Sequence, residues 1–251
     1  SSPYDLIIHN VDSLVLRENF FNHIPHQDIA DGIIFLSLPP FDHEAEQLAK
    51  SEIPVVLVDS EHPLLNRFHQ VRVDDVRGGY LAAQHLLKLG HRRIAFITDF
   101  LVSPYNFQSS TRRFDGFCQA LSEYGVSLDE RLLLQGEHGR LEARDMAVEL
   151  FKLPDRPTAV FATSDTQAVG VLQAAQLCGL CVPEDVSVVG FDDIDLADVM
   201  NLTTIRQMLF ESGRRGIELL LQILDNKNYE PVHETLDMEL IIRGSSGQCQ
   251  V

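Results

Sequence analysis

The stretch TAVFATSDTQAVGVLQAAQLCGLCVPEDVSVVGFDDID (158–195) contains two strand patterns with a helix pattern between them. Residues 158–165 and 185–193 hold short apolar runs rich in valine and phenylalanine, which are typical of strands buried on both faces of a parallel sheet. Residues 166–179 are rich in alanine, leucine and glutamine and end at Gly179, which predicts a helix with a glycine cap. This unit predicts an α/β fold built on a parallel sheet.

The same alternation extends in both directions along the chain. Further strands are predicted at 4–10, 31–39, 53–60, 69–75, 93–99 and 238–246, and further helices around 14–28 (interrupted by Pro25) and at 76–90, 111–125, 141–154 and 209–226. A chain of 251 residues is large for one core and sufficient for two. We therefore predict an α/β protein of two doubly wound parallel-sheet lobes.

Composition excludes several classes of function. The net charge of −17 argues against a chain that itself grips nucleic acid, because phosphates require a basic face. There is no run of 18 apolar residues to span a membrane and no secretory pattern at the start, which favours a cytoplasmic protein. Cys178 and Cys181 form a C-x-x-C at a helix end, where the dipole disfavours a thiolate, so we predict ordinary buried thiols.

Acidic residues stand where nearly every predicted strand ends. The pairs are Asp59–Ser60, Asp74–Asp75, Thr98–Asp99, Ser164–Asp165 and Asp192–Asp193. Ligands of open parallel sheets bind beyond the carboxyl ends of the strands, so these positions predict a polar, acidic binding cleft. Some acids are expected to cap the following helix instead, in particular Asp165 and one of Asp74 and Asp75.

The sequence carries no recognised catalytic signature. It lacks the G-x-S-x-G elbow, the phosphate-binding loop, the G-x-G-x-x-G turn and H-E-x-x-H. The acids of GFDDID (190–195) also lack the glycine and glutamate of a calcium loop. We therefore predict neither an enzyme nor a metal site and expect no cofactor. For Asp192, Asp193 and Asp195, the residues alone leave sugar binding and a solvated turn open.

Five motifs in order make the identification more specific. They are V-x-x-D-D-x-x-G with H-L-x-x-x-G-H-R-x-I within 71–99, R-x-x-G-F-x-x-A-L within 111–121, P-T-A-x-F-x-x-S-D-x-x-A-x-G followed by P-x-D-V-S-V-x-G-F-D-D within 157–197, L-T-T-I-R-Q at 202–207, and I-I-R-G-S-S at 241–246. This pattern resembles the effector-binding core of lactose-repressor/galactose-repressor family transcription regulators, and the resemblance covers about residues 4–246.

The resemblance implies a type I periplasmic-binding-protein-like fold, with two lobes joined by three crossovers. One lobe would comprise 1–73 and 207–239, and the other 74–206 and 240–251. Members of the family are cytoplasmic homodimers or tetramers that bind operator DNA through an N-terminal helix-turn-helix. We expect that segment, and the first strand and helix of the core, to be absent from this chain. The region 208–225 is expected to contribute to the dimer interface.

The resemblance also implies a small-molecule effector, sugar-like in character, bound between the lobes. Asp192 and Arg113 would clamp its polar groups, and Asp59 would contribute from the other lobe, with Ser164 and Asp74 as further candidates. Phe107 is placed to stack on a sugar ring or simply to pack in its loop. Arg113 has an alternative as a surface residue paired with Asp115 or Glu142, and Asp193 has one as a helix cap or turn residue.

The predicted function is therefore the effector-sensing and dimerisation core of a DNA-binding transcriptional regulator. A solute-binding protein of a sugar transporter uses the same core and is the alternative. A sugar hydrolase is a third interpretation, because two carboxylates suffice for that chemistry.

Overall fold

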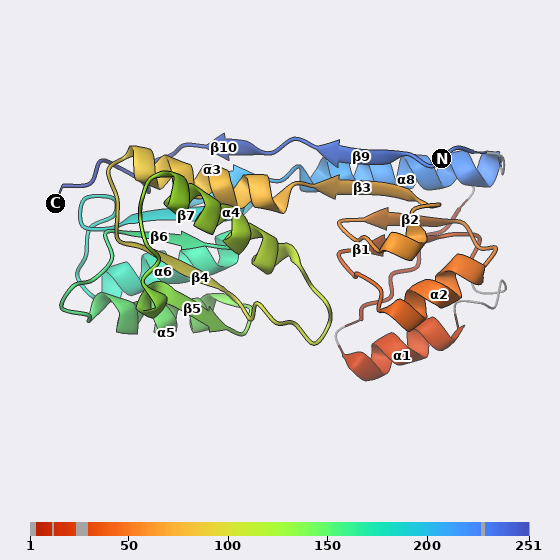
Figure 1. Cartoon of the computed structure of the whole chain (residues 1–251), viewed down its shortest axis with the longest axis horizontal. Coiled ribbons are helices and arrows are strands. Elements are labelled where there is room, and N and C mark those ends of the chain that lie inside the picture. Colours follow the sequence, from red (N-terminus) through yellow and green to blue (C-terminus); the bar gives the residue numbers. More distant parts are fainter. Residues whose placement is uncertain (1–3, 12, 24–29, 227–228, 251) are drawn as a thin grey trace. The chain divides into compact units, whose positions relative to one another are not determined.

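The computed structural model describes residues 4–11, 13–23, 30–226 and 229–250. The chain folds into two compact units, which we call unit 1 (Ser1–Val71 and Arg214–His233) and unit 2 (Arg72–Gly213 and Glu234–Val251). It therefore passes from one unit to the other three times (Figure 1). These passages fall within β3, α8 and β9, whereas the sequence suggested 73/74, 206/207 and 239/240. The residues at which the lobes meet stay a prediction.

Unit 1 is built on a four-stranded sheet with the order β1-β2-β3-β9. Its elements are α1 (Leu14–His23), β1 (Ile33–Leu36), α2 (Asp42–Lys50), β2 (Val55–Val58), the 3-10 turn η1 (Pro63–Leu65), β3 (His69–Val73), most of α8 (Leu209–Asp225) and the start of β9 (His233–Leu236). Phe35 and Leu57 join Phe21 of α1 and Leu48 of α2 in one buried cluster. Successive strand residues face opposite ways, and Val58 packs against α8 at Gly216. Both faces of the sheet are thus covered.

The strand predicted at 4–10 is wrong. Residues 4–11 adopt no regular structure, and Leu6, Ile7 and Ile8 are 79%, 65% and 82% exposed. Among the residues described, β1 pairs only with β2, so no strand takes up the backbone hydrogen bonds of this run. An apolar run becomes a strand only where a neighbour satisfies its N–H and C=O groups. The predicted helix at 14–28 is confirmed as α1 over 14–23, and its remainder with Pro25 lies outside the described residues.

Unit 2 is built on a six-stranded sheet with the order β10-β8-β7-β6-β4-β5. The strands are β4 (Ile94–Asp99), β5 (Leu133–Gly136), β6 (Ala159–Ala162), β7 (Ser187–Asp192), β8 (Thr203–Arg206) and β10 (Glu239–Ile241). All pair in parallel except β10, which runs antiparallel to β8. The helices are α3 (Asp75–Lys88), α4 (Ser109–Glu123), α5 (Arg140–Phe151), α6 (Asp165–Leu177) and α7 (Asp195–Val199), with a 3-10 turn η2 (Glu130–Leu132).

Alternate strand residues of this sheet enter two separate cores. Ile97, Ala162 and Val188 pack under α5 and α6, whereas Phe96 and Phe161 pack under α3 and α4. The helices accordingly cover the sheet on both sides (Figure 1). The predicted α/β fold of two doubly wound, mainly parallel sheets is confirmed.

Helices α3 and α4 approach each other at two glycines. A Cβ on Gly79 would collide with the carbonyl oxygen of Arg113, and a Cβ on Gly116 would collide with that of Val76. Only glycine permits this backbone separation, which explains the glycine of the R-x-x-G-F motif. The close crossing fixes the position of Arg113 above the sheet.

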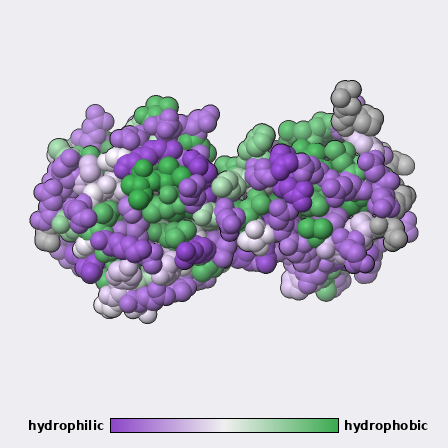
Figure 2. Space-filling model, turned by 90° about the horizontal axis from the view of Figure 1, so that it is seen from above, coloured by the Kyte–Doolittle hydropathy of each residue, from purple (hydrophilic) through white to green (hydrophobic). Residues whose placement is uncertain are grey.

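On the face of each unit seen in Figure 2, most side chains are hydrophilic and apolar side chains gather in places. Large exposed apolar residues include Val199 at the end of α7, which is 77% exposed, and Phe210 in the first turn of α8, which is 85% exposed. None of the helices within the described residues is long and apolar enough to cross a membrane.

Candidate binding site at the carboxyl edge of the unit 2 sheet

The carboxyl ends of the parallel strands β4, β5, β6, β7 and β8 lie along one edge of the unit 2 sheet. The strand registers align Asp99 with Gly136 and Asp192 with Arg206, so these ends are level. The side chains that follow them form a connected polar layer: Asp99, His138, Thr163, Asp192 and Gln207. Such an edge is the usual ligand-binding position of an open parallel sheet.

Arg113 is the central cation of this layer. It is only 8% exposed, its Nε donates to Oδ1 of Asp75 at 2.8 Å, and its Nη1 donates to the carbonyl oxygen of Thr163 at 2.6 Å. Its guanidinium carbon lies 3.6 Å from the centre of the Phe191 ring. Its described ion pairs are with Asp75 and Asp192, so the surface alternative with Asp115 or Glu142 is wrong. The close crossing of α3 and α4 keeps Arg113 away from solvent.

Asp192 ends β7 next to this cation. One carboxylate oxygen, Oδ1, accepts a 2.6 Å hydrogen bond from Nε2 of Gln207 and lies 3.9 Å from Nη1 of Arg113. Burial raises the pKa of Asp192 to about 7, because the attraction of Arg113 offsets desolvation only in part. Its φ is +114°, a strained value for a residue with a side chain. Desolvation and strain at one residue are typical of a functional position.

Asp193 has a different environment. Its Oδ2 accepts from Nε of Arg206 at 2.7 Å, and its Oδ1 accepts from Nη2 of Arg243 at 2.8 Å. Desolvation acts to raise the pKa of Asp193, but the two arginines outweigh it and lower the pKa below its usual value. The residue before α7 is Ile194, so Asp193 is not a helix cap and instead joins β7, β8 and the C-terminal segment. Asp195 is exposed.

The end of β6 provides a cap and a buried acid. Ser164 is the N-cap of α6, and its Oγ accepts from the backbone N–H of Gln167, so the expectation that Asp165 caps this helix is wrong by one residue. Asp165 is fully buried and accepts from the N–H of Ile194 and from the hydroxyl of Thr204. Burial raises its pKa to about 6. A ligand contact by Ser164 stays a prediction.

Asp99 and His138 extend the layer across β4 and β5. Nδ1 of His138 lies 3.1 Å from Oδ1 of Asp99, which also accepts from Nε2 of Gln167 at 3.0 Å. The bond to Asp99 raises the pKa of His138, although desolvation opposes it. His138, Gln167, Gln207 and the partner role of Asp75 were missed from the sequence. His138 lies two residues after β5 and Gln207 directly follows β8, so the rule of strand ends finds them once neutral and basic residues are included.

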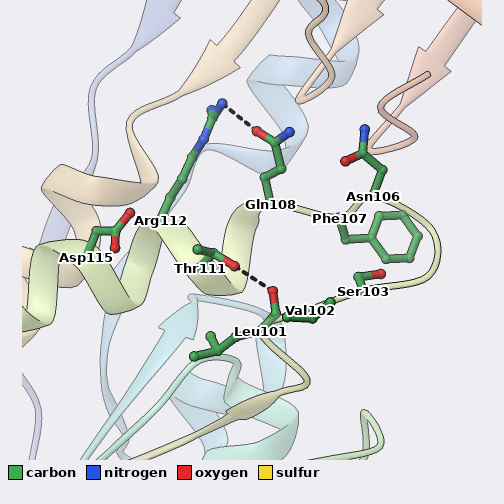
Figure 3. A pocket seen from close by; sticks show the side chains of 9 residues that line it. All are labelled: Leu101, Val102, Ser103, Asn106, Phe107, Gln108, Thr111, Arg112 and Asp115. Carbon is green, nitrogen blue, oxygen red and sulfur yellow. Dashed lines mark hydrogen bonds between the residues drawn. The ribbon is translucent and has the colours of Figure 1, made fainter. Parts of the chain in front are cut away.

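A pocket of about 410 Å³ lies between the loop after β4 and the start of α4. Phe107 lines it, is 41% exposed and stacks on Tyr105 with 5.7 Å between ring centres. The hydroxyl of Thr111 donates to the carbonyl oxygen of Leu101, and Nη2 of Arg112 donates to Oε1 of Gln108, which together hold the loop on the helix (Figure 3). A role of Phe107 in stacking on a ligand stays a prediction.

The two remaining predicted contacts lie elsewhere. Oδ1 of Asp74 accepts from the N–H of Arg77 and caps α3, which confirms the expected cap. Asp59 follows β2 in unit 1 and has a φ of +47°. For both, ligand binding stays a prediction. No group of three or more His, Cys, Asp or Glu in the described part of the chain could hold a metal ion.

Comparison with known proteins agrees with this architecture. Residues 83–246 match the family described as periplasmic binding protein-like domain. The HTH-type transcriptional regulator DegA of Bacillus subtilis is 34% identical over 97% of this chain and 72% of its own length. The HTH-type transcriptional repressor CytR of Escherichia coli is 36% identical over 86% of this chain and 62% of its own length.

Solved structures show the same fold. The transcriptional regulator CelR in complex with cellobiose superposes with a TM-score of 0.80 at 30% identity, covering 93% of this chain and 71% of that one. A LacI family transcriptional regulator from Enterococcus faecium with bound ribose gives a TM-score of 0.82 at 28% identity, covering 97% and 88%. These relatives are transcriptional regulators, which favours the regulator over the transporter interpretation. The chain belongs to the LacI family of transcriptional regulators, of which it forms the effector-binding core.

Proposed function

We propose that this chain senses a hydroxylated, sugar-like small molecule at the carboxyl edge of the unit 2 sheet. The observation that carries the proposal is Asp192, a strained and desolvated carboxylate. Only its Oδ1 has a hydrogen bond among the described residues, to Gln207. A carboxylate accepts hydrogen bonds from adjacent sugar hydroxyls, and a neighbouring guanidinium donates to ring or hydroxyl oxygens. Solved relatives with bound cellobiose and ribose support this ligand class.

The remaining candidate residues have supporting roles in this proposal. Phe107 would cover one apolar face of the ligand, since an aromatic ring packs well on the C–H face of a sugar. Ser164 and Asp74 stand at strand and helix ends of unit 2, and Asp59 at a strand end of unit 1. Each would add a hydrogen bond to a hydroxyl.

Binding would act on DNA through a helix-turn-helix segment outside this chain, as the names of the relatives suggest. An effector shifts an equilibrium between two conformations only by its difference in affinity for them. We propose that the protein works in the cytoplasm as a homodimer, with α8 in the interface. Phe210 and Ile217 of α8 are 85% and 48% exposed, so a partner subunit would find apolar side chains to cover on this helix.

Calorimetry with a panel of mono- and disaccharides, including ribose and cellobiose, tests the ligand proposal. The variant Asp192→Ala should abolish binding, whereas Asp198→Ala, which removes an exposed acid of α7, should bind like the parent protein. Circular dichroism checks that both variants fold. Retained affinity in Asp192→Ala would remove this residue from the site, and chemical conversion of the bound sugar would show an enzyme in place of a sensor. Sedimentation of Phe210→Glu tests the interface, because a charge there should weaken the dimer.

A further inference from the structure

The basic groups at the carboxyl edge of unit 2 are already neutralised by carboxylates of the same chain. We infer that the site accepts an uncharged ligand and rejects phosphorylated or carboxylated ones, so that the effector is a free polyhydroxy compound. This inference rests on the proposed site and adds the charge class of its ligand. It is carried by the contacts of Arg113, His138 and Asp192.

The charge of Arg113 is already balanced by a carboxylate. Its Nε is bound to Asp75 at 2.8 Å, its Nη1 to the Thr163 carbonyl at 2.6 Å, its Nη2 donates to Oε1 of Gln207 at 3.4 Å, and one face of its guanidinium lies on Phe191. The side chain of Asp75 is only 11% exposed, so water does not screen this pair effectively. An anionic ligand would have to compete with a carboxylate that is already in place and already desolvated.

The positive charge of His138 is also paired with a carboxylate. Its Nδ1 pairs with Asp99 of β4, and the other charged groups facing it are Asp192 of β7 and Arg113 of α4. Asp99 raises the pKa of the imidazole, so the proton that His138 gains is balanced by the carboxylate that stabilises it. A bound anion would therefore meet an ion pair rather than a separate cation.

Asp192 leaves the edge without excess positive charge. The carboxylates of Asp75 and Asp99 balance the cations of Arg113 and protonated His138, and Asp192 adds a negative charge in its ionised form. In the adjoining pocket, Arg112 donates to Gln108, and Asp115 lines the same wall (Figure 3). Like charges brought together in a partly buried site cost several kcal/mol, which corresponds to an affinity loss of about 100-fold or more.

Matched ligand pairs and inorganic phosphate test the inference on the whole chain. Thermal shift and calorimetry would compare ribose with ribose 5-phosphate, glucose with glucose 6-phosphate, and adenosine with its 5′-monophosphate. Sodium phosphate would be compared with sodium chloride at equal ionic strength. The variant Asp75→Asn keeps the shape of the side chain but releases the charge of Arg113. The variant Asp195→Asn makes the same charge change at an exposed position and serves as its control.

We expect the parent protein and Asp195→Asn to show no phosphate-specific stabilisation. Asp75→Asn should bind inorganic phosphate about 10-fold more tightly than the parent, because a released guanidinium is a good phosphate ligand. Any pair that binds should favour its uncharged member by about 100-fold. Specific phosphate binding by the parent protein, or a phosphorylated ligand that binds as well as its neutral partner, would overturn the inference. If Asp75→Asn gains phosphate but no neutral sugar binds the parent, the charge inference holds and the sugar proposal fails.

Discussion

Replacing Asp192 by asparagine should stabilise the protein at alkaline pH. Folding moves this carboxyl group from water into a site where its pKa is about 7, against a usual value of 3.8. A group whose pKa is raised by folding contributes stability below its unfolded pKa, and that contribution is lost as the pH rises through the folded pKa. Ionisation of Asp192 therefore opposes folding increasingly between about pH 4 and pH 7 and fully above pH 7, and asparagine removes that opposition.

The size of the expected stabilisation follows from the shift in the pKa of Asp192. A displacement of one pKa unit corresponds to about 1.36 kcal/mol, so the advantage of asparagine should rise from on the order of 1–2 kcal/mol at pH 5 to on the order of 4 kcal/mol at pH 8.5. Asparagine keeps an oxygen that can accept from Gln207, and it tolerates a positive φ better than most residues. The substitution thus changes charge with little change in contacts.

Urea unfolding followed by circular dichroism at pH 5 and pH 8.5 measures this difference. Asp193→Asn is the matched control, because the neighbouring arginines lower the pKa of Asp193. The ion pairs of Asp193 with these arginines stabilise the fold above the unfolded pKa of its carboxyl group, and this stabilisation is lost as the pH falls. Asp193→Asn should therefore cost about 3 kcal/mol at pH 8.5 and less in acid. An Asp192→Asn protein that loses stability at pH 8.5, or whose gain does not grow with pH, would refute the reasoning.

Three further substitutions test the contacts that hold the candidate site in place. Gly116→Ala should lower stability by about 1–3 kcal/mol in thermal unfolding, since the added Cβ meets the backbone of α3, and equal stability would contradict the close crossing. Arg113→Lys should weaken effector binding at least about 10-fold in calorimetry, because an ammonium group cannot span both the carboxylate and the carbonyl that the guanidinium contacts. Asp99→Asn should lower the pKa of His138 in an NMR titration, and an unchanged pKa would show that the pair does not hold in solution.

Elements with continuous apolar runs were predictable because burial alone specifies them. The strands at 94–99, 159–162 and 187–192 are buried on both faces, and the helices that follow the first two end at Gly125 and Gly179, as the sequence marks. The run at 4–10 has the same local pattern but no neighbouring strand among the described residues, so propensity does not decide its structure. Strand formation depends on a partner, which a pattern in one segment does not reveal.

The candidate site was predictable as an edge but not as a set of pairs. The rule of strand ends selected Asp99 and Asp192, which both lie at the carboxyl edge of the unit 2 sheet, yet which acid meets which base depends on the crossing of α3 and α4. At that crossing Arg113 donates a hydrogen bond to Asp75, whereas Asp74, one residue earlier, caps α3. The pattern of charged residues in the sequence does not reveal which of two neighbouring aspartates pairs with the arginine.

The two aspartates at the end of β7 show the same limit most clearly. Asp192 is the last residue of β7 and Asp193 lies just beyond it, and both have a positive φ, so the chain leaves the strand here and the two side chains enter different environments. Two arginines bind Asp193 and lower its pKa, whereas Asp192 lies 3.9 Å from Arg113 and burial raises its pKa to about 7. A ligand hydroxyl would supply to Asp192 the hydrogen bonds that folding withholds. The carboxylate that destabilises the unliganded protein is therefore the one that gains most from binding.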